Sequence, residues 1–259
     1  MHNGGMYADD WSRWHDDLER RRADPHGSLS ITGMYWLTGT PQRFDDVPGS
    51  WAEGPDGVTV TLGPGEELTV GGVRLTGEHH FGPVDEEGVE AAFGDALAEI
   101  ARRGSGYIVR PRHPTNPQLL AYAGTPAYAP AEEWIVPGRF VRFGGTQEVK
   151  MGTVVDGLDD IVESPGRVVF TLAGQELALT VFTEPGQFVA FFADPTGGTT
   201  TYPAGRRLRI AEPGPDGSVV VDFNRATNPP CAYTEFATCA LPPAENRLPV
   251  PIEAGERRP

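Results

Sequence analysis

The chain has 259 residues, with 21 Lys and Arg against 36 Asp and Glu and a formal net charge of −15. This length fits one large β domain or two small lobes, and the acidic surface argues against binding nucleic acid or anionic lipid. The 33 Gly and 25 Pro residues are too many for a helical bundle and favour short strands joined by turns. The sequence has neither an apolar run of membrane-spanning length nor a signal-peptide pattern, so we expect a cytoplasmic protein with reduced cysteines.

The first predicted element is a helix that is capped by Asp9 or Asp10 and ends at Asp24-Pro25. Its apolar residues recur at helical spacing on one face, which favours a helix packed on a sheet (Trp11, Trp14, Leu18). Strand patterns follow from Val58, and the glycine pair Gly71-Gly72 predicts a hairpin. The segment 91–103 is compatible with either a helix or a strand.

Several prolines between Arg110 and Pro137 indicate an ordered crossing between two lobes. Beyond it, alternating apolar residues predict strands at 167–172, 177–181, 188–192, 208–210 and 219–223, with a turn at Asp216-Gly217. The sequence therefore predicts a mostly β fold of two packed lobes, sandwich or barrel-like, with an N-terminal helix. The expected division is 1–40 for the helix and the segment after it, 41–125 for the first lobe and 126–259 for the second.

Unusual polar residues concentrate in the last third of the chain. Asp222 and Asn224 alternate with apolar residues and would share one strand face, and Asn228 precedes the stiff Pro229-Pro230 corner. These side chains either cap backbone amides in a complicated turn or form a preorganised polar pocket. The guanidinium group of Arg206 would form an ion pair with Asp222 or Asp194, or bind an anionic ligand. We expect the pair with Asp222.

Cys231 and Cys239 are the two cysteines of the chain. Cys231 is either a buried inert thiol or a nucleophile, for which His80 or His113 could serve as the base only if the lobes meet. The spacing of the cysteines and the lack of a nearby His do not indicate zinc, so we expect no metal and no cofactor.

These segments resemble the bacterial family catalogued as domain of unknown function 1684. The resemblance rests on Asp194-Pro195-Thr196-Gly197-Gly198, Thr201-Tyr202-Pro203-Ala204-Gly205-Arg206, the block from Asp222 to Ala232, and Cys239-Ala240-Leu241-Pro242-Pro243. It covers most of the chain and implies no established activity. The family often has Glu where this chain has Thr200, and Asp where it has His113, so roles for those two carboxylates do not carry over.

We therefore expect a small-molecule pocket in the second lobe, in a protein that could be an enzyme acting on a small polar or anionic substrate. Cys231 and Asp222 are the candidate catalytic residues, and the candidate ligand-binding residues are Thr201, Tyr202, Arg206, Asn224 and Asn228. The alternative is a structural or protein-interaction module in which the same residues only stabilise the C-terminal corner. An open concavity lined by these side chains would favour the first hypothesis, and a sealed network would favour the second.

Overall fold

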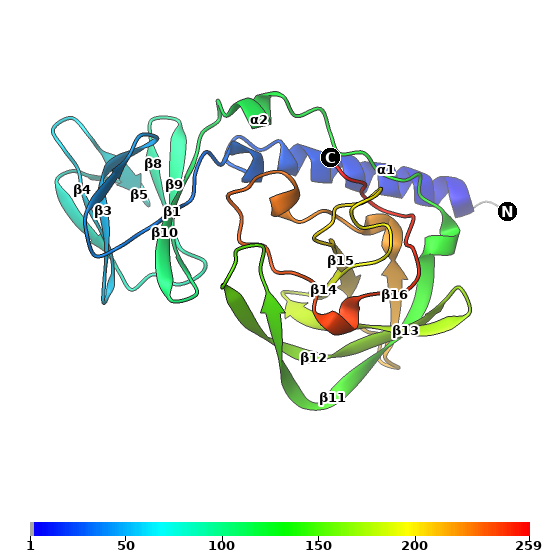
Figure 1. Ribbon diagram of the computed structural model, residues 1–259. Coiled ribbons are helices and arrows are strands. Elements are labelled where there is room, and N and C mark those ends of the chain that lie inside the picture. Colours follow the sequence, from blue (N-terminus) through cyan, green and yellow to red (C-terminus); the bar gives the residue numbers. More distant parts are fainter. Residues whose placement is uncertain (1–2) are drawn as a thin grey trace. The chain divides into compact units, whose positions relative to one another are not determined.

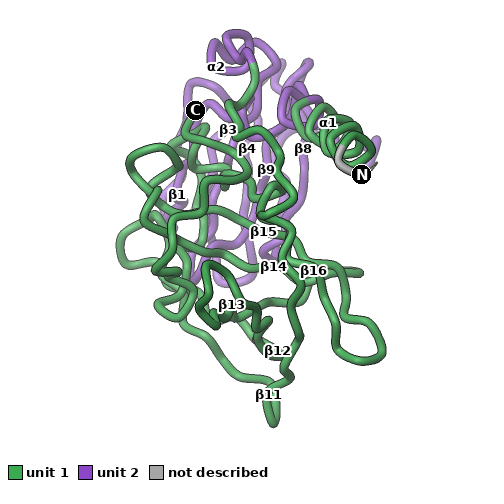
Figure 2. Tube along the Cα trace, turned by 90° about the vertical axis from the view of Figure 1, so that its right-hand side faces the viewer, with its two compact units in different colours: residues 1–19, 124–259 green, residues 20–123 purple. Residues whose placement is uncertain are grey.

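The computed structural model describes residues 3–259, and strands account for 46% of the chain against 15% for helices. The predicted mostly β fold with an N-terminal helix is therefore confirmed (Figure 1). The chain divides into two compact units, which Figure 2 colours separately. Unit 1 combines residues 1–19 with residues 124–259, and unit 2 is the continuous segment 20–123. Within the described chain, no helix is long and apolar enough to cross a membrane.

Unit 2 consists of two antiparallel sheets that share one apolar core. The strand orders are β1-β10-β9-β8-β5-β6 and β2-β3-β4-β7. Fully buried Trp51 and Val60 come from the second sheet, and Leu68 and Ile100 come from the first. The elements are β1 (Tyr35–Trp36), β2 (Gln42–Phe44), β3 (Val47–Gly54), β4 (Gly57–Thr61), β5 (Leu68–Val70), β6 (Val73–Leu75), β7 (Glu78–Phe81), β8 (Val89–Phe93), β9 (Ala96–Arg103), β10 (Gly106–Arg112) and the short helix α2 (Pro117–Leu120).

Two sequence interpretations are decided in this unit. The hairpin between β5 and β6 is confirmed, and Gly71 and Gly72 take φ values of 54° and 81°, which a type I′ turn requires and glycine adopts without strain. The ambiguous segment 91–103 is strand, because β8 and β9 pair along their length with Ala92 opposite Leu97.

Unit 1 is built on one antiparallel sheet of order β15-β14-β13-β12-β11-β16. The sheet curls until its edge strands approach each other, and Figure 1 shows the resulting near-barrel. The strands are β11 (Ile135–Gly152), β12 (Asp159–Leu172), β13 (Gln175–Glu184), β14 (Gln187–Phe192), β15 (Arg206–Ala211) and β16 (Ser218–Asp222). Short 3-10 turns lie before and after them: η2 (Glu132–Trp134) precedes β11, and η3 (Phe223–Arg225), η4 (Pro230–Ala232) and η5 (Ala244–Asn246) follow β16.

Side chains fill the interior of this near-barrel. Along β15 the burial alternates, so Arg206, Leu208 and Ile210 face inward while Arg207 and Arg209 face outward. Inward apolar residues of all six strands form a single core together with residues of the C-terminal loops. Because a small barrel of this kind is packed with side chains, reactive groups of unit 1 have to be sought at its rim and in its loops.

The N-terminal helix α1 (Asn3–Arg22) begins well before the predicted cap at Asp9 or Asp10. Tyr7, which lies ahead of that cap, bonds to Asp222, and Trp11 bonds to the backbone of Asn224. Contacts with the rest of unit 1 therefore extend the helix beyond what its local sequence indicates.

Candidate functional site

Arg206 points into the core of unit 1, and its side chain is 1% exposed. It donates hydrogen bonds to Asp194 Oδ2 at 2.8 Å, to the Ile252 carbonyl at 2.9 Å and to the Ala254 carbonyl. Burial lowers the pKa of Arg206, and the carboxylate of Asp194 opposes that shift. The predicted pair with Asp222 is wrong, and Asp194, the alternative partner, is the one observed. Asp194 follows β14, the strand paired with β15, whereas Asp222 ends β16 at the other edge of the sheet.

Thr201 belongs to the turn that supports this ion pair. It is 1% exposed, and its hydroxyl shares a hydrogen bond of 2.8 Å with the hydroxyl of Thr196. Thr196 also bonds to Asp194 Oδ1 at 2.6 Å. The Thr201 hydroxyl is therefore part of the scaffold that holds the Asp194 carboxylate against Arg206.

Asp222 joins α1 to the corner after β16. Its carboxylate accepts hydrogen bonds from the Tyr7 hydroxyl at 2.8 Å, from the Asn224 amide at 3.2 Å and from Arg225 Nε at 3.2 Å. Burial and the bond to Asp222 raise the pKa of Tyr7, so its hydroxyl remains a donor at neutral pH. The interactions found for Asp222 thus come from three neighbouring side chains and one backbone amide.

Asn224 is 1% exposed and lies in η3, not on a strand face with Asp222, because the chain leaves β16 at Asp222. Its side-chain amide bonds to both backbone groups of Ala131, at 3.0 and 2.9 Å, and its backbone carbonyl accepts a bond of 2.8 Å from Trp11 Nε1. Asn224 therefore pins two distant segments of unit 1 to the same corner.

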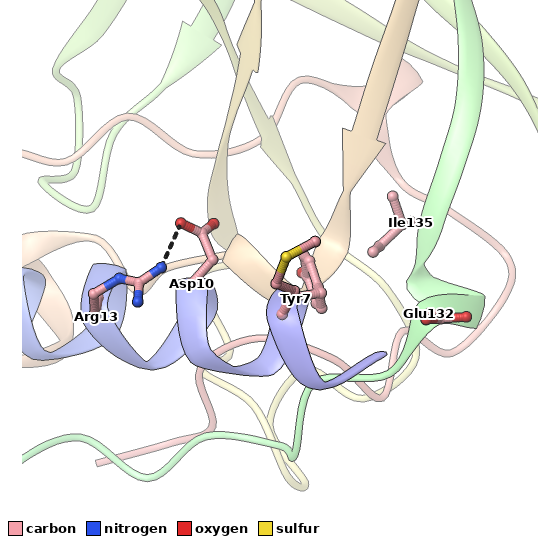
Figure 3. Close-up of a pocket in the computed structure, with 6 residues that line it drawn as sticks. Tyr7, Asp10, Arg13, Glu132 and Ile135 are labelled. Atoms are coloured by element: carbon pink, nitrogen blue, oxygen red, sulfur yellow. Dashed lines mark ion pairs between the residues drawn. The ribbon is translucent and has the colours of Figure 1, made fainter. Parts of the chain in front are cut away.

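A hollow of about 650 Å³ adjoins this corner (Figure 3). Asp10 and Arg13 form an ion pair of 3.7 Å on α1, while Glu132 and Ile135 line the hollow from the segment that enters β11. Tyr7 also lines it and connects it to Asp222. The volume falls in the range of sites that bind small molecules.

Asn228 ties the proline corner to the C-terminal segment. It is 6% exposed, and its side chain donates to the Arg257 carbonyl at 2.8 Å and to the Tyr233 hydroxyl at 3.3 Å. Its backbone amide donates to Glu256 Oε2 at 2.6 Å. Like Arg206 and Asn224, Asn228 forms its hydrogen bonds with other groups of the protein.

Cys231 and Cys239 are both free thiols, partly exposed, and they meet in space. Cys239 Sγ accepts a hydrogen bond of 3.2 Å from the backbone amide of Cys231. The Tyr202 hydroxyl donates to the Cys231 carbonyl at 2.6 Å, and the Cys239 carbonyl accepts the Val154 amide at 2.9 Å. Each cysteine backbone is thus held by a neighbouring segment, and Cys239 Sγ lies against the backbone of Cys231.

The surroundings of Cys231 favour its thiolate. The hydrogen bond with the thiol of Cys239 has the largest effect and, with help from the Tyr202 hydroxyl, lowers the pKa of Cys231 to about 7 against the opposing effect of burial. Burial and the neighbouring cysteines raise the pKa of Tyr202, so this residue stays a hydrogen-bond donor. A thiol with such a pKa is substantially ionised at neutral pH, and the thiolate is the nucleophilic form.

The structure brings six of the seven sequence-predicted residues together in three groups: Cys231 with Tyr202, Asp222 with Asn224, and Thr201 with Arg206 through Asp194. The seventh, Asn228, bonds instead to the C-terminal segment. His80 and His113, the bases considered for Cys231, belong to unit 2. The sequence reasoning missed Tyr7, Arg225 and Glu256. Arg225 lies inside the motif block, where its charge was a signal, but Tyr7 and Glu256 are near the chain ends and lack a local signature.

A comparison with curated proteins finds no match. A solution NMR structure of an uncharacterized protein from Haloarcula marismortui is similar over 52% of this chain and 77% of its own, with 24% sequence identity and a TM-score of 0.45. A family model described as a protein of unknown function, DUF1684, matches residues 120–257, which is more than half of the chain. The chain therefore belongs to the DUF1684 family, as its Thr-Tyr-x-x-Gly-Arg and Asn-Pro-Pro-Cys-Ala segments led us to expect.

Proposed function

We propose that unit 1 exchanges electrons with a small disulfide through Cys231 and Cys239. The observation that carries the proposal is the hydrogen bond from the Cys231 amide to Cys239 Sγ, which brings two partly exposed free thiols together. In this scheme Cys231 is the attacking residue and Cys239 is the resolving residue. The substrate is the small polar molecule expected from the sequence, now specified as a disulfide.

In the first step the Cys231 thiolate attacks one sulfur of the substrate disulfide. The substrate S–S bond breaks, a mixed disulfide forms on Cys231, and the released thiolate takes a proton from solvent. The lowered pKa of Cys231 supports this assignment, because it supplies the thiolate at neutral pH without a separate base.

In the second step Cys239 loses its proton and attacks the sulfur of Cys231. The mixed disulfide breaks, a bond forms between Cys231 and Cys239, and a second substrate thiol leaves. Two protein thiols are oxidised, and one substrate disulfide is reduced to two thiols. In the reducing cytoplasm that the sequence predicts, cellular thiols would return the pair to its reduced form.

The neighbouring charge is favourable for this chemistry. Arg207 is the outward residue next to Arg206 on β15, and it interacts electrostatically with Cys239. Burial and the like charge of Arg209 lower the pKa of Arg207 to about 10, which leaves it cationic at neutral pH. A cation near a cysteine pair favours thiolates, and Glu184 holds Arg207 in place through an ion pair.

The first test is the pH dependence of cysteine alkylation by iodoacetamide in the folded protein. We expect Cys231 to react faster than Cys239, with a rate that rises through a midpoint near pH 7, because only the thiolate reacts. In Cys239→Ala, which has no side-chain donor, the hydrogen bond from the Cys239 thiol is lost, and the midpoint should move up towards the usual thiol value of about 8.5. Cys231→Ser is the matched control, since it leaves Cys239 as the only thiol.

The second test uses oxidised glutathione as the small disulfide and mass spectrometry of the intact chain as the readout. The wild-type chain should form an internal disulfide, and Cys239→Ser should stop at a mixed disulfide with one glutathione on Cys231. Cys231→Ser should react far more slowly. If both thiols of the wild-type chain survive this treatment, and label slowly and equally until denaturant is added, the exchange reaction is refuted.

Survival of both thiols, with slow and equal labelling, would favour the other function, a structural or interaction module. The observation on its side is the burial of Arg206 and Asn224, whose polar groups bond to the protein interior. In that case the motif residues serve to lock the loops of unit 1, and the cysteines are packing residues.

A further inference from the structure

Three potential metal ligands converge in unit 1, outside the thiol pair. His15 and Glu19 are four residues apart on α1, so they lie on the same helix face. Glu256, which is 1% exposed, approaches them from the C-terminal segment. One ligand atom from each residue lies within 4.8 Å of the other two.

His15 is the residue that most clearly points to a ligand. Its Nε2 atom is buried and lacks a hydrogen-bond partner among the described residues. The imidazole is held in place because it stacks on Trp11, with ring centroids 4.8 Å apart and planes 14° apart. A buried polar nitrogen that bonds to nothing is unfavourable, whereas an imidazole nitrogen is a common metal ligand.

Both carboxylates are oriented by hydrogen bonds from the same network. Glu19 Oε2 accepts the Thr125 amide at 3.0 Å, and Glu256 Oε2 accepts the Asn228 amide at 2.6 Å and the Tyr233 hydroxyl at 3.3 Å. The hydroxyls of Thr125 and Tyr233 bond to each other at 2.9 Å, which links the two carboxylates. Outer hydrogen bonds of this kind are the usual means by which proteins orient metal ligands.

The three groups lie close enough together to contact one ion after a small adjustment of their side chains. Ligand atoms that each lie about 2.0–2.2 Å from one ion are separated from one another by up to roughly twice that length. Arg206 lies near Glu256, but it already carries its own counter-ion in Asp194.

We propose that His15, Glu19 and Glu256 bind one divalent transition-metal ion of the Zn²⁺ type. One imidazole and two carboxylates suit such an ion better than the oxygen-only sites of Ca²⁺ and Mg²⁺. Three protein ligands leave a further coordination position for water or a substrate atom. This proposal departs from the absence of a metal expected from the sequence, in which His15 and Glu256 stand near opposite ends of the chain.

The test is zinc binding by the full chain carrying Cys231→Ser and Cys239→Ser, stripped of metal with a chelator. The double substitution removes the thiols, so the result does not depend on the exchange reaction proposed above. Calorimetry and elemental analysis should give one Zn²⁺ per chain. His15→Gln or Glu19→Gln in this background should weaken binding by more than the ~10–100-fold that loss of an outer-shell partner causes.

His80→Gln is the matched control and should leave Zn²⁺ affinity unchanged, because His80 is exposed in unit 2. Zn²⁺ should also raise the melting temperature of the thiol-free chain but not that of the His15→Gln variant. If the thiol-free chain takes up no stoichiometric Zn²⁺, or if both His15→Gln and Glu19→Gln bind it as tightly as their parent, the site does not exist.

Discussion

Asp194→Asn is expected to lower the free energy of unfolding by about 3–5 kcal/mol, because it leaves the buried guanidinium of Arg206 without its counter-charge. The side chains of the pair are 1% and 2% exposed, so water cannot replace the lost carboxylate. Asparagine keeps one oxygen that can accept the Thr196 hydroxyl, so the loss falls on the contact that the other carboxylate oxygen makes with Arg206. Urea unfolding monitored by fluorescence and circular dichroism measures the effect.

The matched control is Asp159→Asn, which breaks an ion pair of similar length, 2.7 Å, with Lys150. Those side chains are 47% and 71% exposed, and exposed pairs contribute about 0–1 kcal/mol. Equal destabilisation by the two substitutions would contradict the assignment of Arg206 as a buried structural cation.

Glu99→Gln should destabilise unit 2 by a comparable amount, about 3–5 kcal/mol. Glu99 is 4% exposed and receives bonds from Arg103 and Arg110, each at 2.7 Å, and from Arg112. Glutamine keeps the shape but removes the single charge that these three arginines share. Glu90→Gln is the control, because Glu90 contacts Arg112 from a side chain that is 57% exposed, and its loss should change stability by about 0–1 kcal/mol.

Glu99 also predicts how the free energy of unfolding depends on pH. Burial opposes ionisation of Glu99, but Arg110 and the other two arginines outweigh it and hold the pKa of Glu99 below its usual 4.5. A depressed pKa in the folded state stabilises the protein above the usual value, and this contribution is lost as the pH falls below it. The wild-type chain should therefore lose stability below about pH 4.5 more steeply than Glu99→Gln. Parallel pH profiles for the two proteins would contradict this role.

Strands were predictable because their signal is local. The alternation at Val219 and Val221 reflects burial on one face of the sheet, and β16 has that pattern. The segment 91–103 was ambiguous because alanine fits a helix as well as a strand, and pairing with a neighbouring strand decided the matter. The early start of α1 depends on the bond from Tyr7 to Asp222, which no local pattern contains.

The candidate site was predictable in its residues but not in its pairings. Cys231 and Tyr202 stood out as reactive or polar side chains in stiff turns, yet their contact depends on how separate loops of unit 1 meet. We predicted the wrong partner for Arg206 because Asp194 and Asp222 have similar local sequence surroundings. The strand order, which places Asp194 beside Arg206, is a long-range property that the local sequence does not contain. How these residues act on a ligand stays a prediction.

The make-up of unit 1 has a consequence for synthesis on the ribosome. Unit 2 is continuous over residues 20–123 and can fold as soon as that segment has emerged, whereas unit 1 needs residues 1–19 together with 124–259. The first helix must therefore wait, with Trp11 and Trp14 unburied, until the last strands and the C-terminal segment have been made. Contacts of such long sequence separation form slowly and leave apolar surface open to aggregation or to chaperones. Truncation of even the last few residues, which include Glu256, should accordingly leave an assembled unit 2 attached to an incomplete unit 1.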